Sequence, residues 1–305
     1  MQICVGVLSY NSEKTIIETL NSILSQTYAV NKIELIISDD CSEDGTLTIV
    51  ENWLSEHKDS FFSTSLLKNK TNSGVSNSLN KLINSTKSLW IKPIAADDIL
   101  APDCINFNTK FLAENNSAKL IFSNISKFSN MQNKEKMQRN RMDMKFFQST
   151  SEEQYKSLLY DCKIHAPTAF LNVQFLVDIG GVNQNFVMME DYPLWLKATL
   201  NREKLHAFDE VTVFYRLGES LSQTNRTFGN ERYLSDKYNF YKEMIWPQVS
   251  LVKQLDDRVM FFSKKALIKF FKNRRNTLSK SIYIATFVLR PFSVYKKIQG
   301  FMNGY

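Results

Sequence analysis

Two neighbouring carboxylates follow a predicted buried strand. Asp97 and Asp98 come almost directly after the apolar run Leu89–Ile94. Carboxylate oxygens suit Mg²⁺ and Mn²⁺, and two adjacent carboxylates repel each other unless a cation or hydrogen bonds offset their charge. The pair therefore predicts a divalent-metal site at Asp97 and Asp98. The alternative is that the pair begins a surface turn ahead of Pro102.

A second pair of carboxylates begins a predicted helix. Glu190 and Asp191 precede Tyr192-Pro193-Leu194-Trp195-Leu196, a run of aromatic and apolar residues. The N-terminus of a helix favours ionised carboxylates, and a general base must be ionised to accept a proton. The pattern predicts a catalytic base here. The alternative is a negatively charged first turn that only complements the helix dipole.

Polar residues also follow two other predicted strands. Ser9-Tyr10-Asn11 comes after Gln2–Leu8, and Asp39-Asp40 comes after Ile33–Ser38. One aspartate after a strand is usually a helix cap, so the prediction depends on the whole set. Because ligands of open α/β sheets bind at the carboxyl ends of the strands, we expect these groups and Asp97-Asp98 to line one site.

The elements that must position these groups alternate between strand and helix over residues 1–125. Expected strands are Gln2–Leu8, Ile33–Ser38, Ser65–Lys68, Leu89–Ile94 and Lys119–Ser123. Expected helices are Glu13–Gln26, Gly45–Glu56, one through Leu79, Leu82 and Ile83, and one from Pro102 to Glu114. This alternation predicts an α/β fold with a mostly parallel sheet and helices on both faces.

The later part of the chain has weaker patterns. The polar stretch 129–145 predicts either a mobile loop near the mouth of the site or a solvated helix. Further expectations are a helix at Gln154–Leu159, a turn at Gly180-Gly181, a helix at Glu190–Leu200, a strand at Val211–Arg216 and helices beyond it.

Glycine placement argues against two large enzyme classes. Rossmann dehydrogenases and P-loop NTPases hold phosphates with glycine-rich turns after an early strand. The chain has nine glycines, and none forms either motif. A metal or basic side chains must therefore meet any phosphate charge.

Several features predict a cytoplasmic protein. The four cysteines are widely spaced, without a metal-binding or disulfide pattern, so we expect reduced thiols. No apolar stretch approaches the roughly 20 residues that cross a bilayer. The sequence begins with a strand pattern rather than a signal peptide.

Positive charge is concentrated near the end of the sequence. Eleven of the 38 Lys and Arg residues, and none of the 31 Asp and Glu residues, lie between Arg258 and Tyr305. A helical pattern over Val259–Arg275 places apolar residues on one side and basic residues on the other. The apolar set is Met260, Phe262, Ala266, Leu267, Phe270 and Phe271, and Phe261 and Ile268 breach the pattern. A basic amphipathic tail, 258–305, is typical of binding to an anionic membrane surface; the alternative is a helix packed on the catalytic domain. Charge confined to the tail does not indicate nucleic-acid binding.

The ordered motifs resemble the inverting family 2 glycosyltransferases with the GT-A fold. The resemblance runs from Gln2 to about Ser222. It is carried by Val5-Gly6-Val7-Leu8-Ser9-Tyr10-Asn11, Ser22-Ile23-Leu24-Ser25-Gln26-Thr27-Tyr28, Ser38-Asp39-Asp40-Cys41-Ser42-Glu43-Asp44-Gly45-Thr46, Asn72-Ser73-Gly74-Val75-Ser76, Ile94-Ala95-Ala96-Asp97-Asp98 and Glu190-Asp191-Tyr192 followed by Leu194-Trp195-Leu196.

The resemblance implies a role for each matched position. Ser9, Tyr10 and Asp39 would contact the nucleotide, and Asp40 would support their loop. Asp97 would contact the ribose and share a Mg²⁺ or Mn²⁺ ion with Asp98. Asp191 would be the catalytic base. For the acceptor, the candidate contacts are His165, Glu190 and Trp195.

The sequence departs from the family pattern at three positions. Ala95 replaces the first aspartate of the usual DxD motif. Leu79 precedes Asn80 where many members have arginine, which predicts a weaker base or phosphate contact. Gly218 replaces a histidine that serves some members as a metal ligand.

These observations predict a glycosyltransferase that uses a nucleoside-diphosphate sugar, with UDP as the expected nucleotide. The acceptor would be a saccharide or lipid-linked saccharide at the inner face of a bacterial membrane, in surface polysaccharide synthesis. We expect a catalytic domain at 1–222, with a nucleotide-sugar half at 1–125 and an acceptor half at 126–222, and a helical region at 223–305. One alternative is a nucleotidyltransferase, although Leu8–Lys14 lacks the expected glycine-rich basic loop. Another is a non-catalytic nucleotide-sugar-binding subunit.

Overall fold

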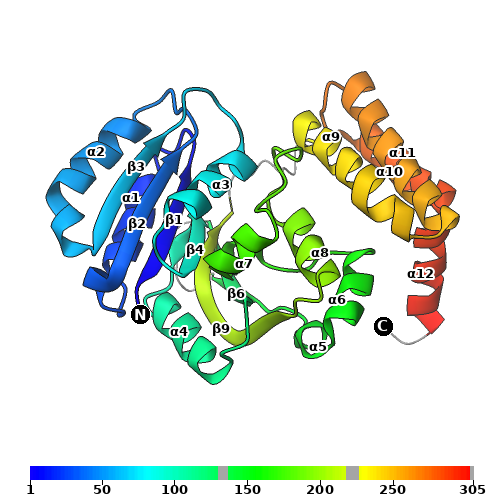
Figure 1. The fold of residues 1–305 in the computed structure, drawn as a ribbon. Coiled ribbons are helices and arrows are strands. Elements are labelled where there is room, and N and C mark those ends of the chain that lie inside the picture. Colours follow the sequence, from blue (N-terminus) through cyan, green and yellow to red (C-terminus); the bar gives the residue numbers. More distant parts are fainter. Residues whose placement is uncertain (130–136, 218–226, 303–305) are drawn as a thin grey trace. The chain divides into compact units, whose positions relative to one another are not determined.

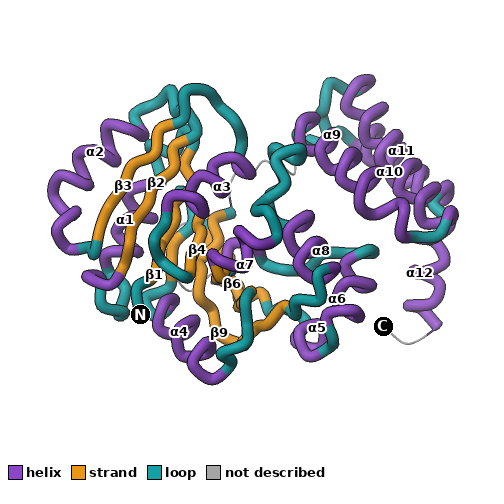
Figure 2. Tube along the Cα trace, viewed as in Figure 1, coloured by secondary structure: helices purple, strands orange, loops and turns teal. Residues whose placement is uncertain are grey.

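The structure, a computed structural model, describes residues 1–129, 137–217 and 227–302 (Figure 1). The chain divides into two units, residues 1–218 and residues 219–305. All strands of the described residues belong to the first unit, whereas the described part of the second unit consists of helices and their connections (Figure 2).

Four parallel strands form the first half of the sheet. They are β1 (Ile3–Ser9), β2 (Ile33–Asp39), β3 (Ser63–Lys68) and β4 (Trp90–Ala95), adjacent in the order β3-β2-β1-β4. Every residue of β2 is buried, as expected for a parallel strand covered on both faces. All four expected strands are present.

Helices cover both faces of these strands. The apolar side chains of β1, such as Val5, share a core cluster with α1 (Ile16–Leu24), α2 (Thr46–His57) and the start of α4 (Cys104–Glu114). The opposite face meets α3 (Val75–Ser85): a Cβ atom on Gly6 would lie 2.8 Å from Cδ1 of Leu82. The α/β prediction with helices on both faces is confirmed.

The second half of the sheet mixes strand directions. β8 (Phe170–Asn172) is antiparallel to both β4 and β6 (Leu120–Phe128), β9 (Leu205–Arg216) is parallel to β6, and β5 (Ile99–Leu100) is antiparallel to β9. The sequence predicted β6 and β9 as shorter strands. It missed β5 and β8 because two or three residues are too few to show an alternating pattern.

Among its described residues, the polar stretch 129–145 is neither a continuous loop nor a continuous helix. These residues contain β7 (Gln138–Asn140), which is antiparallel to β6, and the start of α5 (Met144–Gln148). Residues 130–136 lie outside the described part of the chain. The expected helices near 154–159 and 190–200 are α6 (Ser151–Leu158) and α8 (Tyr192–Leu200). The sequence missed α7 (Val173–Asp178), which the side chain of Asn172 caps.

Aromatic residues form the core of the second unit. Its elements are α9 (Glu231–Phe240), the π-helical turn η5 (Tyr241–Ile245), the 3₁₀ turn η6 (Trp246–Gln248), α10 (Leu251–Phe270), α11 (Thr277–Ala285), the 3₁₀ turn η7 (Thr286–Leu289) and α12 (Pro291–Met302). Tyr241 packs edge-on against Phe261 of α10, with 5.4 Å between the ring centroids, and Trp246 is 4% exposed.

The predicted apolar side of Val259–Arg275 is divided between the surface and the core. Phe262 and Phe270 are exposed, as a membrane-facing side requires, whereas Leu267 is buried together with Phe261 and Ile268, which the pattern treated as breaches. Membrane binding by the exposed residues stays a prediction. Residue 258 also lies inside α10, so the basic tail 258–305 is not a separate element.

Buried polar contacts join the basic tail to the helix residues before it. Asp256 accepts hydrogen bonds from Ser293 N (2.8 Å) and Arg290 Nε (3.2 Å). Lys253 and Asp257 form a buried ion pair. No helix among the described residues combines the length and apolar character needed to cross a bilayer.

Candidate active site

The ends of β1 and β2 bring the first candidate residues together. Ser9 and Asp39 are paired across these two strands. Asp39 is 1% exposed, and its carboxylate accepts hydrogen bonds from Ser42 N (2.8 Å), Ser42 Oγ (2.6 Å) and Ser9 Oγ (3.4 Å). Tyr10, in the loop that follows β1, is 47% exposed, so its ring is open to a ligand.

The loops after β1 and β2 also hold each other. Asn11, in the left-handed region with a φ of 49°, donates its N–H to Ser42 Oγ at 2.8 Å and accepts from Glu43 N at 2.9 Å through Oδ1. Glu13 Oε2 accepts from Gly45 N at 2.9 Å. These reciprocal contacts fix the backbone around Tyr10 and Asp39.

Asp40 turns away from these loops toward the start of α3. Its carboxylate accepts hydrogen bonds from Gly74 N (2.7 Å), Ser73 N (2.9 Å), Ser73 Oγ (3.0 Å) and Asn69 Nδ2 (2.6 Å). At 5% exposure, its lone pairs are directed at protein donors. Asp40 therefore joins β2 to the Asn72-Ser73-Gly74 turn.

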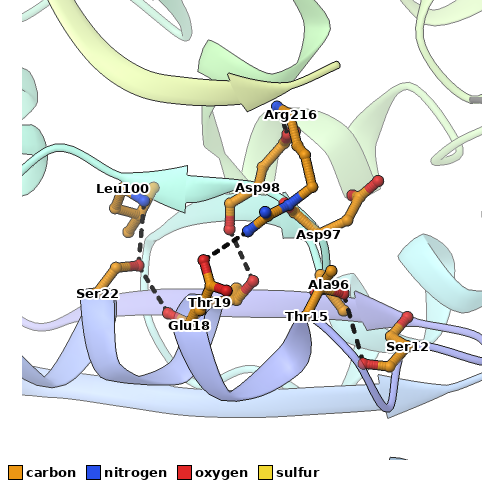
Figure 3. A network of polar contacts seen from close by, with 10 residues as sticks. All are labelled: Ser12, Thr15, Glu18, Thr19, Ser22, Ala96, Asp97, Asp98, Leu100 and Arg216. Carbon is orange, nitrogen blue, oxygen red and sulfur yellow. Dashed lines mark hydrogen bonds and ion pairs between the residues drawn. The ribbon is translucent and has the colours of Figure 1, made fainter. Parts of the chain in front are cut away.

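Asp97 and Asp98 lie in the turn between β4 and β5, against α1 (Figure 3). Helix α1 supports the turn from below: Thr19 Oγ1 donates to the backbone oxygen of Asp98 (2.7 Å), and Thr15 Oγ1 donates to that of Ala96 (2.9 Å). The Asp98 side chain is buried and accepts a hydrogen bond from Arg216 N at 2.9 Å.

The electrostatics of this turn leave its negative charge poorly compensated. Burial, and then the neighbouring Asp97, raise the pKa of Asp98 to about 7. Desolvation by the surrounding protein atoms also raises the pKa of Asp97, although part of that residue is exposed. Raised carboxyl pKa values mean that the ionised forms lack stabilising partners, which a nearby cation would supply.

Arg216, at the end of β9, is a residue to which sequence analysis gave no role. Its Nε donates to the backbone oxygen of Asp97 at 2.8 Å, and Nη2 pairs with Glu18 of α1 at 2.7 Å (Figure 3). The guanidinium also lies 4.6 Å from the ring centroid of Phe128. The sequence placed Arg216 at the end of the expected strand Val211–Arg216, but only the fold brings β9 to the β4–β5 turn.

The residues present suit a divalent cation in part. Asp97 and Asp98 supply hard oxygen ligands, and their raised pKa values indicate that a positive charge would be stabilised between them. Ala95 contributes no ligand, and no group of three or more His, Cys, Asp or Glu residues is placed for a metal within the described ranges. Diphosphate oxygens and water would have to complete such a shell. Gly218 lies outside the described residues.

Glu190 and Asp191 lie at the start of α8, with Asp191 at the N-cap position. Burial, followed by the neighbouring Asp191, raises the pKa of Glu190. A proton held on Glu190 removes a like charge beside Asp191, which favours the ionised carboxylate that a base requires.

The other acceptor candidates differ in exposure. Trp195 is 2% exposed and packs edge-on against Phe122 at 4.7 Å. Its indole Nε1 is buried and has no hydrogen-bond partner among the described residues, and the expectation that Trp195 contacts an acceptor stays a prediction. His165 is half-buried, and burial, followed by Lys127, lowers its pKa to about 4, so its imidazole is neutral near pH 7. Buried Nδ1 of His165 has no hydrogen-bond partner among the described residues.

Leu79 and Lys92 are two buried residues near the site. Leu79 is 3% exposed, so it belongs to the core rather than to a phosphate-binding surface. Lys92 of β4 is fully buried and donates to the backbone oxygens of Pro93 (2.9 Å) and Pro167 (2.5 Å). Sequence analysis gave it no role, although it lies within the predicted buried strand Leu89–Ile94.

A family profile described as "Glycosyl transferase family 2" matches residues 4–175, more than half of the chain. Among curated relatives, WfaP of Escherichia coli, a UDP-Glc:alpha-D-GlcNAc-diphosphoundecaprenol beta-1,3-glucosyltransferase, is 26% identical over 73% of this chain and 80% of its own. TarS of Staphylococcus aureus, a poly(ribitol-phosphate) beta-N-acetylglucosaminyltransferase, is 30% identical over 40% of this chain. EpsE of Bacillus subtilis, named a putative glycosyltransferase, is 33% identical over 37%. The matches span only 38% of EpsE and 20% of TarS.

Solved structures support the fold. TarS 1–349 in complex with UDP-GlcNAc aligns with a TM-score of 0.59 and 19% identity, covering 94% of this chain and 79% of its own. The mannosyltransferase PcManGT of Pyrobaculum calidifontis, in complex with GDP-Man and Mn²⁺, aligns with a TM-score of 0.53 and 15% identity, covering 100% and 76%. The expected GT-A fold is confirmed.

Proposed function

The chain belongs to glycosyl transferase family 2, and we propose that it transfers a sugar from a UDP-sugar to a lipid-linked saccharide with inversion of the anomeric carbon. The observation that carries this proposal is the set of polar groups after β1, β2 and β4, which meet at one edge of the sheet. That edge is where open α/β sheets bind nucleotides.

The donor would bind to the loops after β1 and β2. Tyr10 has an exposed ring that can pack on a base, and Ser9 and Asp39 lie beside it. UDP is the proposed nucleotide because WfaP is named for UDP-Glc and TarS was solved with UDP-GlcNAc. The GDP-Man complex of PcManGT shows that the fold also accepts another nucleotide.

Asp97 and Asp98 would hold Mg²⁺ or Mn²⁺ against the donor diphosphate. When bound, the cation supplies the positive charge that stabilises the departing diphosphate. Asp98 is held for this role by Arg216 N, and α1 fixes the backbone of the turn. The Mn²⁺ in the PcManGT complex supports a divalent ion in this fold.

Asp191 would act as the general base. It takes the proton of the acceptor hydroxyl while that oxygen forms a bond to the anomeric carbon. The bond from that carbon to the diphosphate breaks on the opposite side, and the nucleoside diphosphate leaves with the bonding electrons. Burial and the neighbouring Asp191 raise the pKa of Glu190, and a protonated Glu190 would, with His165, offer polar contacts to the acceptor.

The acceptor is proposed to be a saccharide on a lipid diphosphate, by analogy with the printed substrate of WfaP. We further propose that the enzyme works at the cytoplasmic face of a bacterial membrane, in surface polysaccharide synthesis. Supporting features lie in the second unit, where apolar side chains are exposed beside basic ones. The exposed apolar residues of α11 and η7 are Leu278, Ile282, Ile284, Val288 and Leu289.

Membrane binding can be tested on the full-length protein with vesicles. Reversing the charge of Lys272, Arg274 and Arg275 to Glu should release most protein from anionic phosphatidylglycerol vesicles, because each basic residue near the surface contributes on the order of 1 kcal/mol. Reversal of three exposed lysines of the first unit, Lys58, Lys110 and Lys163, is the matched control. Equal loss in both variants, or equal binding to neutral vesicles, would refute the proposed surface.

Activity can be tested by UDP release from a panel of UDP-sugars, with and without GlcNAc linked to a prenyl diphosphate. The proposal predicts acceptor-dependent release with at least one UDP-sugar. Formation of a nucleotide-sugar from a sugar phosphate would identify the nucleotidyltransferase alternative, and binding without release would identify the non-catalytic one.

A further inference from the structure

The beginning of α3 lies between a carboxylate of the nucleotide side and the segment that leads to the base. Gly74 N donates to Asp40 Oδ2 at 2.7 Å. A Cβ atom on Gly74 would lie 2.2 Å from Val187 Cγ1 and 2.6 Å from Val187 O, and Gly74 has a φ of +87°. Both the backbone conformation and the close approach therefore require glycine. Val187 is four residues ahead of Asp191.

Two side chains of α3 hold the same segment by hydrogen bonds. Ser76 Oγ donates to Phe186 O at 2.6 Å. Asn80 forms a reciprocal pair with Val182: its Nδ2 donates to Val182 O, and its Oδ1 accepts from Val182 N, both at 2.8 Å. Ser76 and Asn80 are one helical turn apart and so lie on one face of α3.

The segment from Gly181 to Asp191 contains neither helix nor strand. It is shaped by short turns, such as Met189 N to Phe186 O at 3.1 Å, and by the buried side chains of Phe186 and Met189. Without a regular hydrogen-bond ladder, its path depends on the contacts with α3. The place where α8 begins, and with it the position of Asp191, depends on that path.

We propose that Ser76 and Asn80 are positioning residues for Asp191, acting through the Gly181–Met189 segment from a helix whose first turn is held by Asp40. This inference rests on the proposed function, in which Asp191 is the general base. It adds a mechanical link between the nucleotide side and the base: Asp40 fixes Gly74, α3 fixes the segment, and the segment fixes Asp191.

Asn80→Ala is the main test of this link. A displacement of about 1 Å at a catalytic group can cost on the order of 10²-fold in rate, so kcat for transfer should fall roughly 10- to 100-fold. The Kd for UDP should stay within about 2-fold, because the hydrogen bonds of Asn80 to described residues go to Val182 and not to the proposed nucleotide loops. Asn80→Asp keeps the acceptor of the Val182 N–H but lacks the donor to Val182 O, so its loss should be smaller than that of Asn80→Ala. Asn84→Ala, at an exposed position on the same helix, is the matched control and should leave kcat unchanged.

A double-mutant cycle distinguishes positioning from a general effect on the fold. If Asn80 acts through Asp191, then adding Asn80→Ala to Asp191→Asn should cause almost no further loss of residual turnover. Multiplied losses in the double variant, or a parallel weakening of UDP binding in Asn80→Ala, would overturn the inference. Full activity of Asp191→Asn alone would instead contradict the proposed base.

Ser76→Ala gives a second measurement that removes one hydroxyl and little volume. It should lower kcat about 3- to 10-fold, consistent with the loss of one buried hydrogen bond, and it should also be non-additive with Asp191→Asn. If Asn80→Ala does not fold, Ser76→Ala and Asn80→Asp decide the question by the same cycle. Wild-type kcat in both would overturn the inference.

Discussion

The carboxylates after β2 and those after β4 lie at the same edge of the sheet but differ in how the protein holds them. Asp40 accepts four hydrogen bonds from backbone and side-chain donors, and Asp39 accepts three. Asp98 accepts one from a described residue, Arg216, and its pKa is raised to about 7. At the start of α8, Glu190 also has a raised pKa.

This difference distinguishes carboxylates that stabilise loops from carboxylates whose negative charge would be compensated by a ligand or a proton. A buried carboxylate with several N–H and O–H donors is stabilised as an anion by the fold itself. A buried carboxylate with few donors is destabilised as an anion by desolvation, unless a cation, a proton or a substrate compensates its charge. We therefore expect loss of Asp40 to affect chiefly stability, and loss of Asp98 or Asp191 to affect chiefly catalysis.

The largest effect is expected for Asp191→Asn. The amide retains the size of the side chain but cannot accept the proton of the acceptor hydroxyl, so kcat should fall about 10²- to 10⁴-fold. The Kd for UDP should hardly change. The rate of sugar transfer is the measurement, and Asp178→Asn in α7 is a control with unchanged kcat. Turnover of Asp191→Asn within a few-fold of wild type would show that another group is the base.

Asp40→Ala should instead lower the free energy of unfolding by about 2–4 kcal/mol. The change leaves Gly74 N, Ser73 N and Asn69 Nδ2 without their buried acceptor. Chemical denaturation measures the loss, and Asp59→Ala, at an exposed position, should change stability by less than about 0.5 kcal/mol. If the free energy of unfolding of Asp40→Ala equalled that of wild type, the proposed difference between the carboxylates after β2 and those after β4 would be refuted.

A smaller effect concerns the pH dependence of stability at His165. Burial lowers its folded-state pKa from the ordinary value of 6.5 to about 4. The unfolded chain therefore takes up a proton between pH 6.5 and 4 that the folded protein does not, and wild type loses stability as pH falls through this window. His165→Gln should lose less over the same range, by on the order of 1 kcal/mol. Parallel pH profiles of thermal unfolding for the two proteins would refute the lowered pKa.

Sequence patterns predicted the nucleotide half of the fold better than the acceptor half. Strands such as β1 and β2 are mostly apolar, so their burial can be predicted from the local sequence alone. β5 and β8 have two and three residues, and partners distant in the chain stabilise them. In α10, helical spacing predicted an apolar side that includes Phe262 and Phe270, which are exposed, but it did not predict the aromatic packing that buries Phe261.

The same limit applies to the candidate site. Motifs located Asp39, Asp98 and Asp191, because each follows a recognisable pattern. They gave no role to Arg216 or to Asn80, whose partners lie far away in sequence, at Asp98 and Val182. Trp195, an acceptor candidate, is buried, and no local pattern distinguishes a buried tryptophan from one that lines a binding surface.

The central claim is that Asp97 and Asp98 act on the nucleotide through a cation, and calorimetric titration of UDP with Mn²⁺ or with chelator tests it most directly. Wild type should bind UDP at least about 10-fold more tightly with Mn²⁺, because a cation held by Asp97 and Asp98 would supply positive charge to the diphosphate. Asp98→Asn should lose this difference without a fall in Tm, since the change removes a poorly compensated buried charge. Equal UDP affinity with Mn²⁺ and with chelator in wild type, or an undiminished Mn²⁺ effect in Asp98→Asn, would contradict the claim.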